Sequence, residues 1–209
     1  IFDYPSDSLA QEAEMSTEEF EDFVYGACIQ DWEKKSKSMD KIVNIMNGDV
    51  VRIVGDNTDI TLSIGGRKWV KGDGRCNMPD GEIFTAPNEK KTEGFIEFDL
   101  ATIRGGREVA GVRLEFNEGK VVKASAVKNN DYLQGMLNTD EGARYLGELG
   151  IGLNEGITKP IRNILFDEKI NGTIHLAIGS AYAECGGVNK SAVHWDFIKT
   201  MKTGIIFLD

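Results

Sequence analysis

The chain has 209 residues, of which 41% are hydrophobic, and this is enough to bury a substantial core in one large domain or two small ones. Its formal net charge of −10, with basic residues scattered along the chain, argues against a nucleic-acid-binding surface. The sequence has no apolar run long enough for a membrane-spanning helix, no secretory signal pattern and no CxxC pair among its three cysteines, so we expect a cytoplasmic protein without a membrane partner.

Residues 1–48 are expected to form a helical segment. Ser16 is followed three residues later by Glu19, the capping-box pattern that begins a helix, and apolar residues then recur at helical spacing. The pattern predicts a helix from about Thr17 to Lys35 and a second, short helix over Asp40 to Met46. Because the first residue is Ile rather than Met, we expect the chain to be a piece of a longer protein.

Residues 49–130 change to short β-rich runs separated by turns that contain Gly and Asn, which predicts antiparallel hairpins. The runs are "VVRIV", "DITLSI", "GEIFTA", "GFIEFDLA", "VAGVRLEF" and "KVVKASAV". Helical spacing returns over residues 131–149 and predicts a helix that ends at Gly150. Residues 161–209 are strand-like again, in "IHLAIGSAY", "AVHWDFI" and "GIIFL". These elements predict one α+β domain over residues 1–209, with a mostly antiparallel sheet that could be barrel-like and with flanking helices.

The two histidines of the chain are candidates for a metal site. His194 and Asp196 are two residues apart in a strand-like run, so their side chains are expected on one face of a sheet, about 6.6 Å apart. That distance allows both side chains to converge on one cation. An isolated His-x-Asp also occurs by chance, and His175 could equally be a structural histidine.

Two acidic positions add to this candidate site. Glu141 and Glu148 would share one face of the predicted helix about 10.5 Å apart, so at most one of them can serve a single metal centre, and Glu148 is better placed beside the "LGIG" stretch. A turn at "MPDG" delivers Glu82 to the head of a strand. The alternative for Glu82 is an ordinary hairpin turn with a solvated carboxylate.

Taken together, these segments resemble one family. The stretches "DYPSDSLAQEAEMS", "TDITLSIGGRKW", "NMPDGEIFTAP", "NTDEGARYLGELG", "LFDE" before "HLAIGSAY", and "VHWDF" follow one another in the order found in the M29 family of metal-dependent aminopeptidases. The resemblance covers nearly the whole chain, and it implies a catalytic domain without the N-terminal domain that members of the family carry.

The resemblance implies a centre with two divalent cations, Zn, Co or Mn, acting on peptides with a free N-terminus. The residues that match metal ligands are Glu82, Glu148, Glu168, His175, His194 and Asp196. Glu148 would bridge the two ions, Tyr182 matches the site tyrosine, and Glu82 or Glu168 would relay a proton. Glu168 is the assignment that fits least well, because the segment between Glu168 and His175 is longer than is usual in the family. The resemblance also implies a homodimer for the full-length protein.

Two alternatives remain open. His-x-Asp with a distant His is the ligand set of non-heme iron oxygenases, although in them the distant His follows the pair and no role would remain for Glu82 and Glu148. The other alternative is an inactive, metal-poor domain that serves only in assembly.

Overall fold

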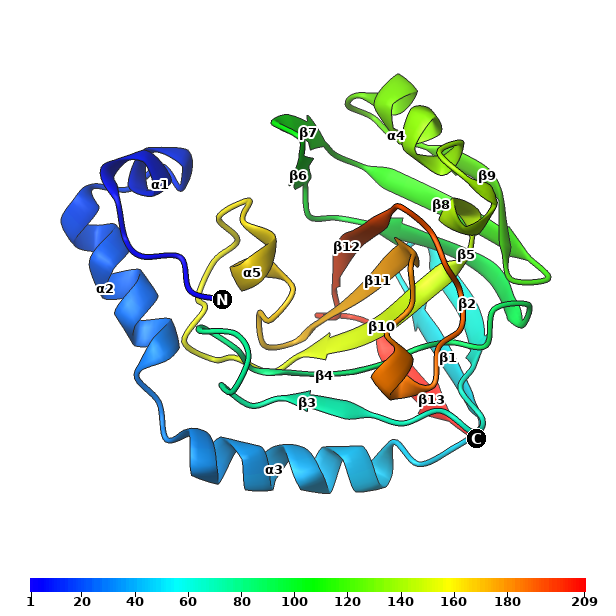
Figure 1. Ribbon diagram of the computed structural model, residues 1–209, viewed down its shortest axis with the longest axis horizontal. Helices are drawn as coiled ribbons and strands as arrows, with labels where there is room; N and C mark the ends of the chain where they lie inside the picture. Colours follow the sequence, from blue (N-terminus) through cyan, green and yellow to red (C-terminus); the bar gives the residue numbers. More distant parts are fainter.

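The strands of the computed structural model, which describes residues 1–209, form three sheets in which every pair of neighbouring strands is antiparallel (Figure 1). The six-stranded sheet has the order β13–β1–β2–β5–β8–β9, the five-stranded sheet has the order β12–β11–β10–β4–β3, and β6 pairs with β7. The predicted α+β fold with mostly antiparallel sheets is confirmed, and the sheets do not close into a barrel.

The strands are β1 (Val50–Gly55), β2 (Thr58–Ser63), β3 (Val70–Gly72), β4 (Glu82–Thr85), β5 (Thr92–Phe98), β6 (Thr102–Arg104), β7 (Arg107–Val109), β8 (Val112–Asn117), β9 (Lys120–Ser125), β10 (Leu146–Gly152), β11 (Thr173–Gly179), β12 (His194–Thr200) and β13 (Ile205–Leu208). The helices are α1 (Asp7–Glu12), α2 (Thr17–Cys28), α3 (Trp32–Ile45), α4 (Asn130–Leu137) and α5 (Ile164–Asp167), with two 3₁₀ turns at Glu141–Arg144 and Ala183–Cys185.

The main hydrophobic core contains 26 buried residues from both large sheets. Strand β2 of the six-stranded sheet alternates between buried and half-buried side chains, as expected for a sheet that packs one face on a core. Strand β11 of the five-stranded sheet is buried at all seven positions, so this sheet is covered on both faces. The face of the five-stranded sheet that does not join the main core carries the candidate site.

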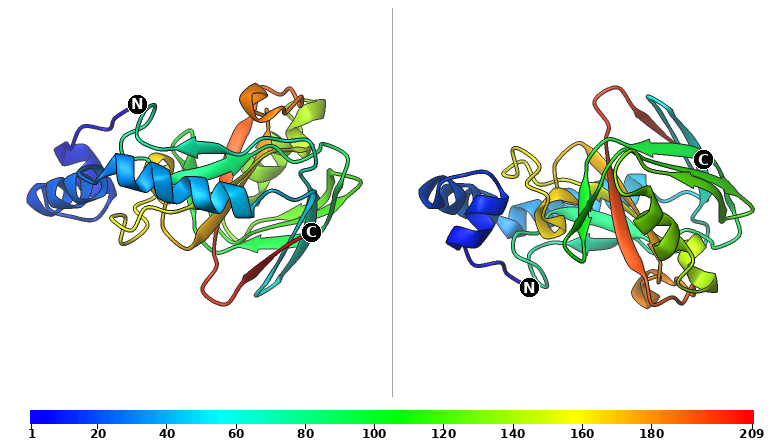
Figure 2. Two further views of the ribbon diagram at one scale, coloured as in Figure 1. Left: turned by 90° about the horizontal axis from the view of Figure 1, so that it is seen from below. Right: turned by 90° about the horizontal axis from the view of Figure 1, so that it is seen from above.

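The N-terminal helices confirm the predicted capping box, but they divide at a different place. The Ser16 hydroxyl accepts a hydrogen bond from the Glu19 backbone, and the Glu19 carboxylate accepts one from the Ser16 backbone. The helix predicted from Thr17 to Lys35 ends at Cys28, where the Trp32 indole donates to the Cys28 carbonyl. Asp31 caps α3, which runs beside β3 and β4 in Figure 2. The short helix predicted over Asp40 to Met46 is the second half of α3, which begins earlier than predicted.

The helix predicted over residues 131–149 is wrong. Helix α4 ends at Leu137, and residues 146–152 form β10, the central strand of the five-stranded sheet, so Gly150 is not a helix cap. A β-bulge between Leu146 and Glu148 inserts Gly147, and this puts the core-facing residues Leu146 and Leu149 three positions apart. A bulged strand therefore produced the spacing of a helix.

A second hydrophobic cluster of ten buried residues joins α1 and α2 to α5 and the segment before it. The rings of Phe23 and Phe166 lie 5.8 Å apart, and the carboxylate of Asp167 accepts a hydrogen bond from the backbone of Ile161. These contacts fix the end of α5, where Glu168 follows. No helix in the structure combines the length and the apolar character needed to cross a membrane.

Candidate metal centre

Five of the predicted site residues lie on one face of the five-stranded sheet. Ala177 of β11 pairs with Glu148 of β10 on one side and with Asp196 of β12 on the other, so these two carboxylates flank it. His175 precedes Ala177 by two residues and therefore shares its face. Glu82 begins β4, and His194 begins β12. The register of four neighbouring strands thus brings residues far apart in the sequence to one place.

Glycine provides the room for the imidazole of His175. Gly150 is the β10 residue paired with His175, and a Cβ atom at Gly150 would lie 2.0 Å from His175 Nε2. The bulge residue Gly147 is equally confined, because its Cβ would lie 2.2 Å from the Ser180 carbonyl oxygen. Side chains at these two positions would displace the groups around Glu148 and His175.

The side chains form a continuous chain of carboxylates and imidazoles. His175 Nε2 lies 3.2 Å from Glu82 Oε2 and 3.4 Å from Glu148 Oε1. His194 Nε2 lies 3.2 Å from Glu148 Oε2 and 3.7 Å from Asp196 Oδ1. Glu148 therefore stands between the two imidazoles, as a bridging ligand must.

Backbone carbonyls fix the orientation of both imidazoles. His175 Nδ1 lies 3.0 Å from the Glu168 carbonyl oxygen, and His194 Nδ1 lies 2.8 Å from the Ser180 carbonyl oxygen. A carbonyl can only accept, so each Nδ1 carries the proton and donates. Each Nε2 then points toward the carboxylates, which is the arrangement that orients metal-binding histidines.

Glu168 joins the cluster from the end of α5. Its carboxylate, His175 and Asp196 offer ligand atoms that lie within 4.8 Å of one another, and the same limit holds for Glu82–Glu148–His175 and for Glu148–His194–Asp196. The neighbouring residue Lys169 is fully buried, and its ammonium group donates to the Glu168 carboxylate. Lys169 Nζ also lies 3.6 Å from Glu82 Oε1.

The pKa shifts reflect how closely these groups are packed. Burial raises the pKa of Glu148, but the two imidazoles outweigh it and hold the pKa far below its ordinary value, at about 2. Burial lowers the pKa of His194, but Glu148 and Asp196 reverse this and raise it to about 9. For Asp196, burial followed by the charge of Glu148 raises the pKa. Without a metal, protons on the imidazoles therefore balance the carboxylates.

Two buried oxygens show that the cluster suits a cation. Glu82 Oε2 and Asp196 Oδ1 are buried and accept no hydrogen bond, despite the imidazole nitrogens nearby. A buried carboxylate oxygen without a partner is costly unless it coordinates an ion. Carboxylate oxygen and imidazole nitrogen, without thiolate, are donors for Zn, Co or Mn, so the residues present fit the divalent ions expected from the sequence.

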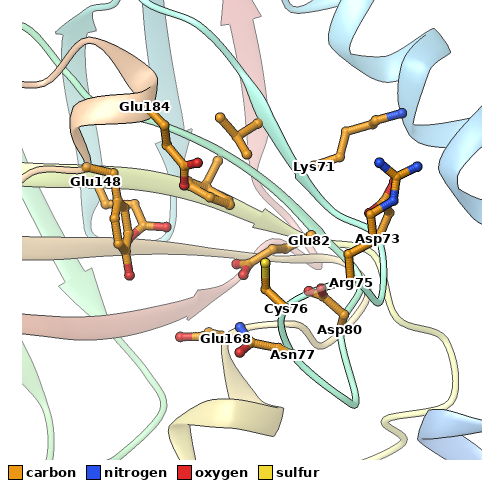
Figure 3. Close-up of a pocket in the computed structure, with 14 residues that line it drawn as sticks. Lys71, Asp73, Arg75, Cys76, Asn77, Asp80, Glu82, Glu148, Glu168 and Glu184 are labelled. Carbon is orange, nitrogen blue, oxygen red and sulfur yellow. The ribbon is translucent and has the colours of Figure 1, made fainter. Parts of the chain in front are cut away.

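A cavity of about 340 Å³ opens onto these carboxylates. Figure 3 shows Glu82, Glu148 and Glu168 among the residues that line it, with Cys76 drawn beside Glu82 and Asn77 beside Glu168. Tyr182 also lines the cavity, with its ring centroid 5.3 Å from that of Phe84 and 5.0 Å from that of His194. Burial raises the pKa of Tyr182 above its ordinary value, so its hydroxyl keeps its proton and can donate.

The structure brings all six predicted ligands into one cluster and puts Tyr182 beside it. The longer segment after Glu168 does not remove that residue from the cluster. Sequence reasoning missed Lys169, a cation placed directly after a site carboxylate, and it misread Gly150 as a helix cap. The alternation of Glu148, Gly150 and Gly152 along "GELGIG" was the signal for a strand that leaves room on one face.

Comparison with known sequences identifies relatives that are named metalloproteases or aminopeptidases. A family model described as thermophilic metalloprotease (M29) matches residues 1–208. Aminopeptidase T of Thermus thermophilus is 31% identical over 195 residues, which is 80% of this chain and 47% of that protein. Aminopeptidase AmpS of Bacillus subtilis is 30% identical over 200 residues, or 81% of this chain and 48% of that protein. The chain spans about half the length of the curated relatives it matches.

Solved structures share the fold. Wild-type AmpT from Thermus thermophilus aligns with a TM-score of 0.80 and 28% identity, covering 91% of this chain and 54% of that one. The 2,5-dihydroxypyridine dioxygenase of Pseudomonas putida KT2440 aligns with a TM-score of 0.71 over 99% of this chain and 66% of that one, but at 17% identity it shows the fold alone. From the family match over nearly every residue, the chain belongs to the M29 family of thermophilic metalloproteases.

Proposed function

We propose that this chain is the catalytic domain of a metal-dependent aminopeptidase that releases N-terminal amino acids from peptides. The observation that carries the proposal is the convergence of four carboxylates and two imidazoles, with two buried carboxylate oxygens that lack partners, beside a cavity that three of the carboxylates line. The aminopeptidase names of its relatives support the same reaction.

The proposed ligands are two overlapping sets that share Glu148. One set is Glu82, Glu148 and His175, the other is Glu148, His194 and Asp196, and Glu168 can add a carboxylate beside His175 and Asp196. Two divalent cations held there would supply a water molecule of lowered pKa and would polarise the scissile carbonyl. The number of ions and the choice among Zn, Co and Mn are part of the proposal.

The protein groups around the cavity have separate proposed roles. The Tyr182 hydroxyl would donate a hydrogen bond to the oxyanion that forms on the attacked carbonyl. Glu168 is a candidate to hold the proton taken from water, because burial raises its pKa to about 8, although Lys169 opposes the rise. Glu82 is the alternative carrier, since its Oε2 is free of hydrogen bonds.

The oxygenase alternative is compatible with the fold, because the dioxygenase of Pseudomonas putida has a similar fold. The fold therefore does not distinguish a peptidase from an oxygenase, so the set of metal-ligand residues has to distinguish them. A 2-His-1-carboxylate iron site would use His175, His194 and one carboxylate, which would leave the others buried without an ion. Four carboxylates match the charge of two divalent cations, and this favours the peptidase.

One experiment separates peptidase, oxygenase and inactive domain. The purified chain is stripped of metal by dialysis against a chelator, loaded with cobalt, zinc, manganese or iron(II), and measured for bound metal, leucine p-nitroanilide hydrolysis and oxygen uptake. We expect metal binding with hydrolysis, and no hydrolysis of an N-acetylated peptide. Oxygen uptake with iron alone would support the oxygenase, and a protein that binds no metal would contradict both enzyme proposals.

The matched variants are Glu148→Gln and Glu141→Gln. Each variant replaces one carboxylate with an amide. The two positions are seven residues apart, but only Glu148 belongs to the cluster. We expect Glu148→Gln to abolish hydrolysis and Glu141→Gln to retain it. Full activity in a folded Glu148→Gln variant would refute the bridging role.

A homodimer in the full-length protein remains a proposal that rests on the resemblance, and a cytoplasmic location remains one that rests on the sequence patterns. Light scattering of the full-length protein tests the first, and fractionation of cells tests the second. Neither affects the chemistry proposed for the cluster.

A further inference from the structure

Lys169 is a fully buried lysine whose charged partners belong to the proposed metal centre. Its ammonium group donates to the Glu168 carboxylate and lies 3.6 Å from Glu82 Oε1. Buried lysines are rare because removal of an ammonium group from water is costly unless it is paired. The residue therefore introduces a fixed positive charge beside two carboxylates that are proposed to hold a cation.

The charges of the cluster show why this matters. Glu82, Glu148, Glu168 and Asp196 carry four negative charges when ionised, which equals the charge of two divalent cations when both imidazoles are neutral. Lys169 adds a fifth positive charge to this buried place, where the further carboxylate near it is that of the buried Asp80. Like charges repel strongly where water does not screen them.

The repulsion is not shared equally between the two ligand sets. Lys169 contacts Glu82 of the set Glu82–Glu148–His175, which we name the proximal set. The distal set, Glu148–His194–Asp196, contains no residue within ion-pair distance of Lys169. An ion in the proximal set would therefore compete with Lys169 for Glu82, whereas an ion in the distal set would not.

We propose that Lys169 is a positioning residue that makes the two metal positions unequal, so that the distal set binds its ion first and tightly and the proximal set binds its ion second and weakly. The ammonium group donates to Glu168 and lies beside Glu82 Oε1, and it leaves Glu82 Oε2 beside His175 Nε2, where that oxygen could serve as a ligand. This inference rests on the metal centre of the proposed function and does not depend on peptide hydrolysis.

The test is a titration of the metal-free chain with Co²⁺. Binding is measured during the titration by calorimetry and by the visible absorption of bound cobalt. We expect two separate steps in the wild-type chain, the second weaker by about tenfold or more. Lys169→Met removes the charge at similar length, and we expect it to bring the two affinities together. Lys169→Arg keeps the charge and should keep the two steps apart. Lys169→Gln, which can still donate a hydrogen bond, replaces Lys169→Met if that variant does not fold.

The matched control is Lys199→Met. Lys199 is also buried, but its ammonium group donates to the backbone carbonyls of Asp56 and Glu97, outside the cluster. We expect this variant to lose stability and to keep both cobalt steps unchanged. The inference would be overturned if the wild-type chain bound both cobalt ions with equal affinity, or if a folded Lys169→Met or Lys169→Gln variant kept the wild-type difference between the two affinities. Either result would leave the aminopeptidase proposal intact. A chain that binds no cobalt would instead overturn the metal centre itself, and this inference with it.

Discussion

The two faces of the five-stranded sheet are both largely buried and are chemically opposite. One face carries Leu149, Leu176 and Phe197, which join the main hydrophobic core. The other face carries carboxylates and imidazoles, most of which are also buried. Burial of apolar groups stabilises the fold, whereas burial of charges costs free energy unless they are paired or bind metal. The contrast implies that the first face supports folding and that the second face is retained for chemistry.

The largest expected effect is on the hydrophobic face. Leu176 follows His175 along β11 and points to the opposite side. Leu176→Ala should lower the free energy of unfolding by about 2–5 kcal/mol, because the surrounding core cannot fully close the cavity. Denaturant unfolding measures the loss, and metal bound per folded molecule should remain at the wild-type value. Loss of metal from the folded variant would show that the two faces are not independent.

The next largest effect is expected on the polar face of the sheet, where a substitution should lower the activity and leave the free energy of unfolding nearly unchanged. Tyr182→Phe deletes one hydroxyl that lines the cavity and has no hydrogen-bond partner in the protein, so the fold loses little. Loss of one donor to an oxyanion lowers kcat by about 100- to 1,000-fold, or about 3 kcal/mol. Steady-state hydrolysis of leucine p-nitroanilide measures this.

The control for that substitution is Tyr132→Phe. Tyr132 packs against Trp195, on the hydrophobic side of β12. Its hydroxyl does not line the cavity, so kcat should stay near the wild-type value. Equal losses in both variants would exclude a special role for Tyr182.

A smaller effect is expected where the polar face has least room. Gly150→Ala adds a Cβ atom that would lie 2.0 Å from His175 Nε2, so the imidazole has to move. Disturbing the orientation of a metal-binding histidine typically costs about 10- to 100-fold in metal affinity. Cobalt titration checks the result. Gly135→Ala is the control, because a Cβ atom at Gly135 of α4 would meet nothing within 4 Å. If Gly150→Ala bound cobalt with the wild-type affinity, the close fit between Gly150 and the His175 imidazole would be refuted.

The two sheets also differ in how far the sequence predicts them. Runs such as "DITLSI" alternate because the six-stranded sheet packs mainly one face on the core, and their strands were predicted correctly. The central strand β10 was predicted as part of a helix, because the bulge at Gly147 puts Leu146 and Leu149 at helical spacing. Pairing with β4 and β11 decides its structure, and a single sequence does not display such long-range contacts.

The candidate site was predictable residue by residue, but its electrostatics were not. His-x-Asp on a strand, the turn before Glu82 and the position of Glu148 gave local signals, and the resemblance to the M29 family supplied Glu168 and assigned His175 as a ligand. Lys169 had no signal, because a lysine after "FDE" is ordinarily solvated, whereas the folded chain buries it beside Glu82 and Glu168. Charge balance in a buried cluster depends on three-dimensional neighbours.

The smallest expected effect is a pH dependence confined to the polar face of the metal-free chain. His194 has a pKa of about 9 in the folded chain against an ordinary value of 6.5, because Glu148 and Asp196 outweigh burial. The folded state then binds more protons than the unfolded state between these values, so stability is fully present below pH 6.5 and is lost as the pH rises to 9. Glu168 acts in the same direction, since burial raises its pKa to about 8 despite the opposing charge of Lys169.

Thermal unfolding in a chelator should therefore show a melting temperature that falls by a few degrees from pH 6.5 to 9. His194→Asn should reduce that slope, because the titrating imidazole is removed, whereas Leu176→Ala should lower the melting temperature at every pH and leave the slope unchanged. Saturating metal should abolish the slope, because bound cations replace the protons on these groups. A metal-free chain that becomes more stable between pH 6.5 and 9 would contradict the charge arrangement, since protonated imidazoles could then not be what balances the buried carboxylates.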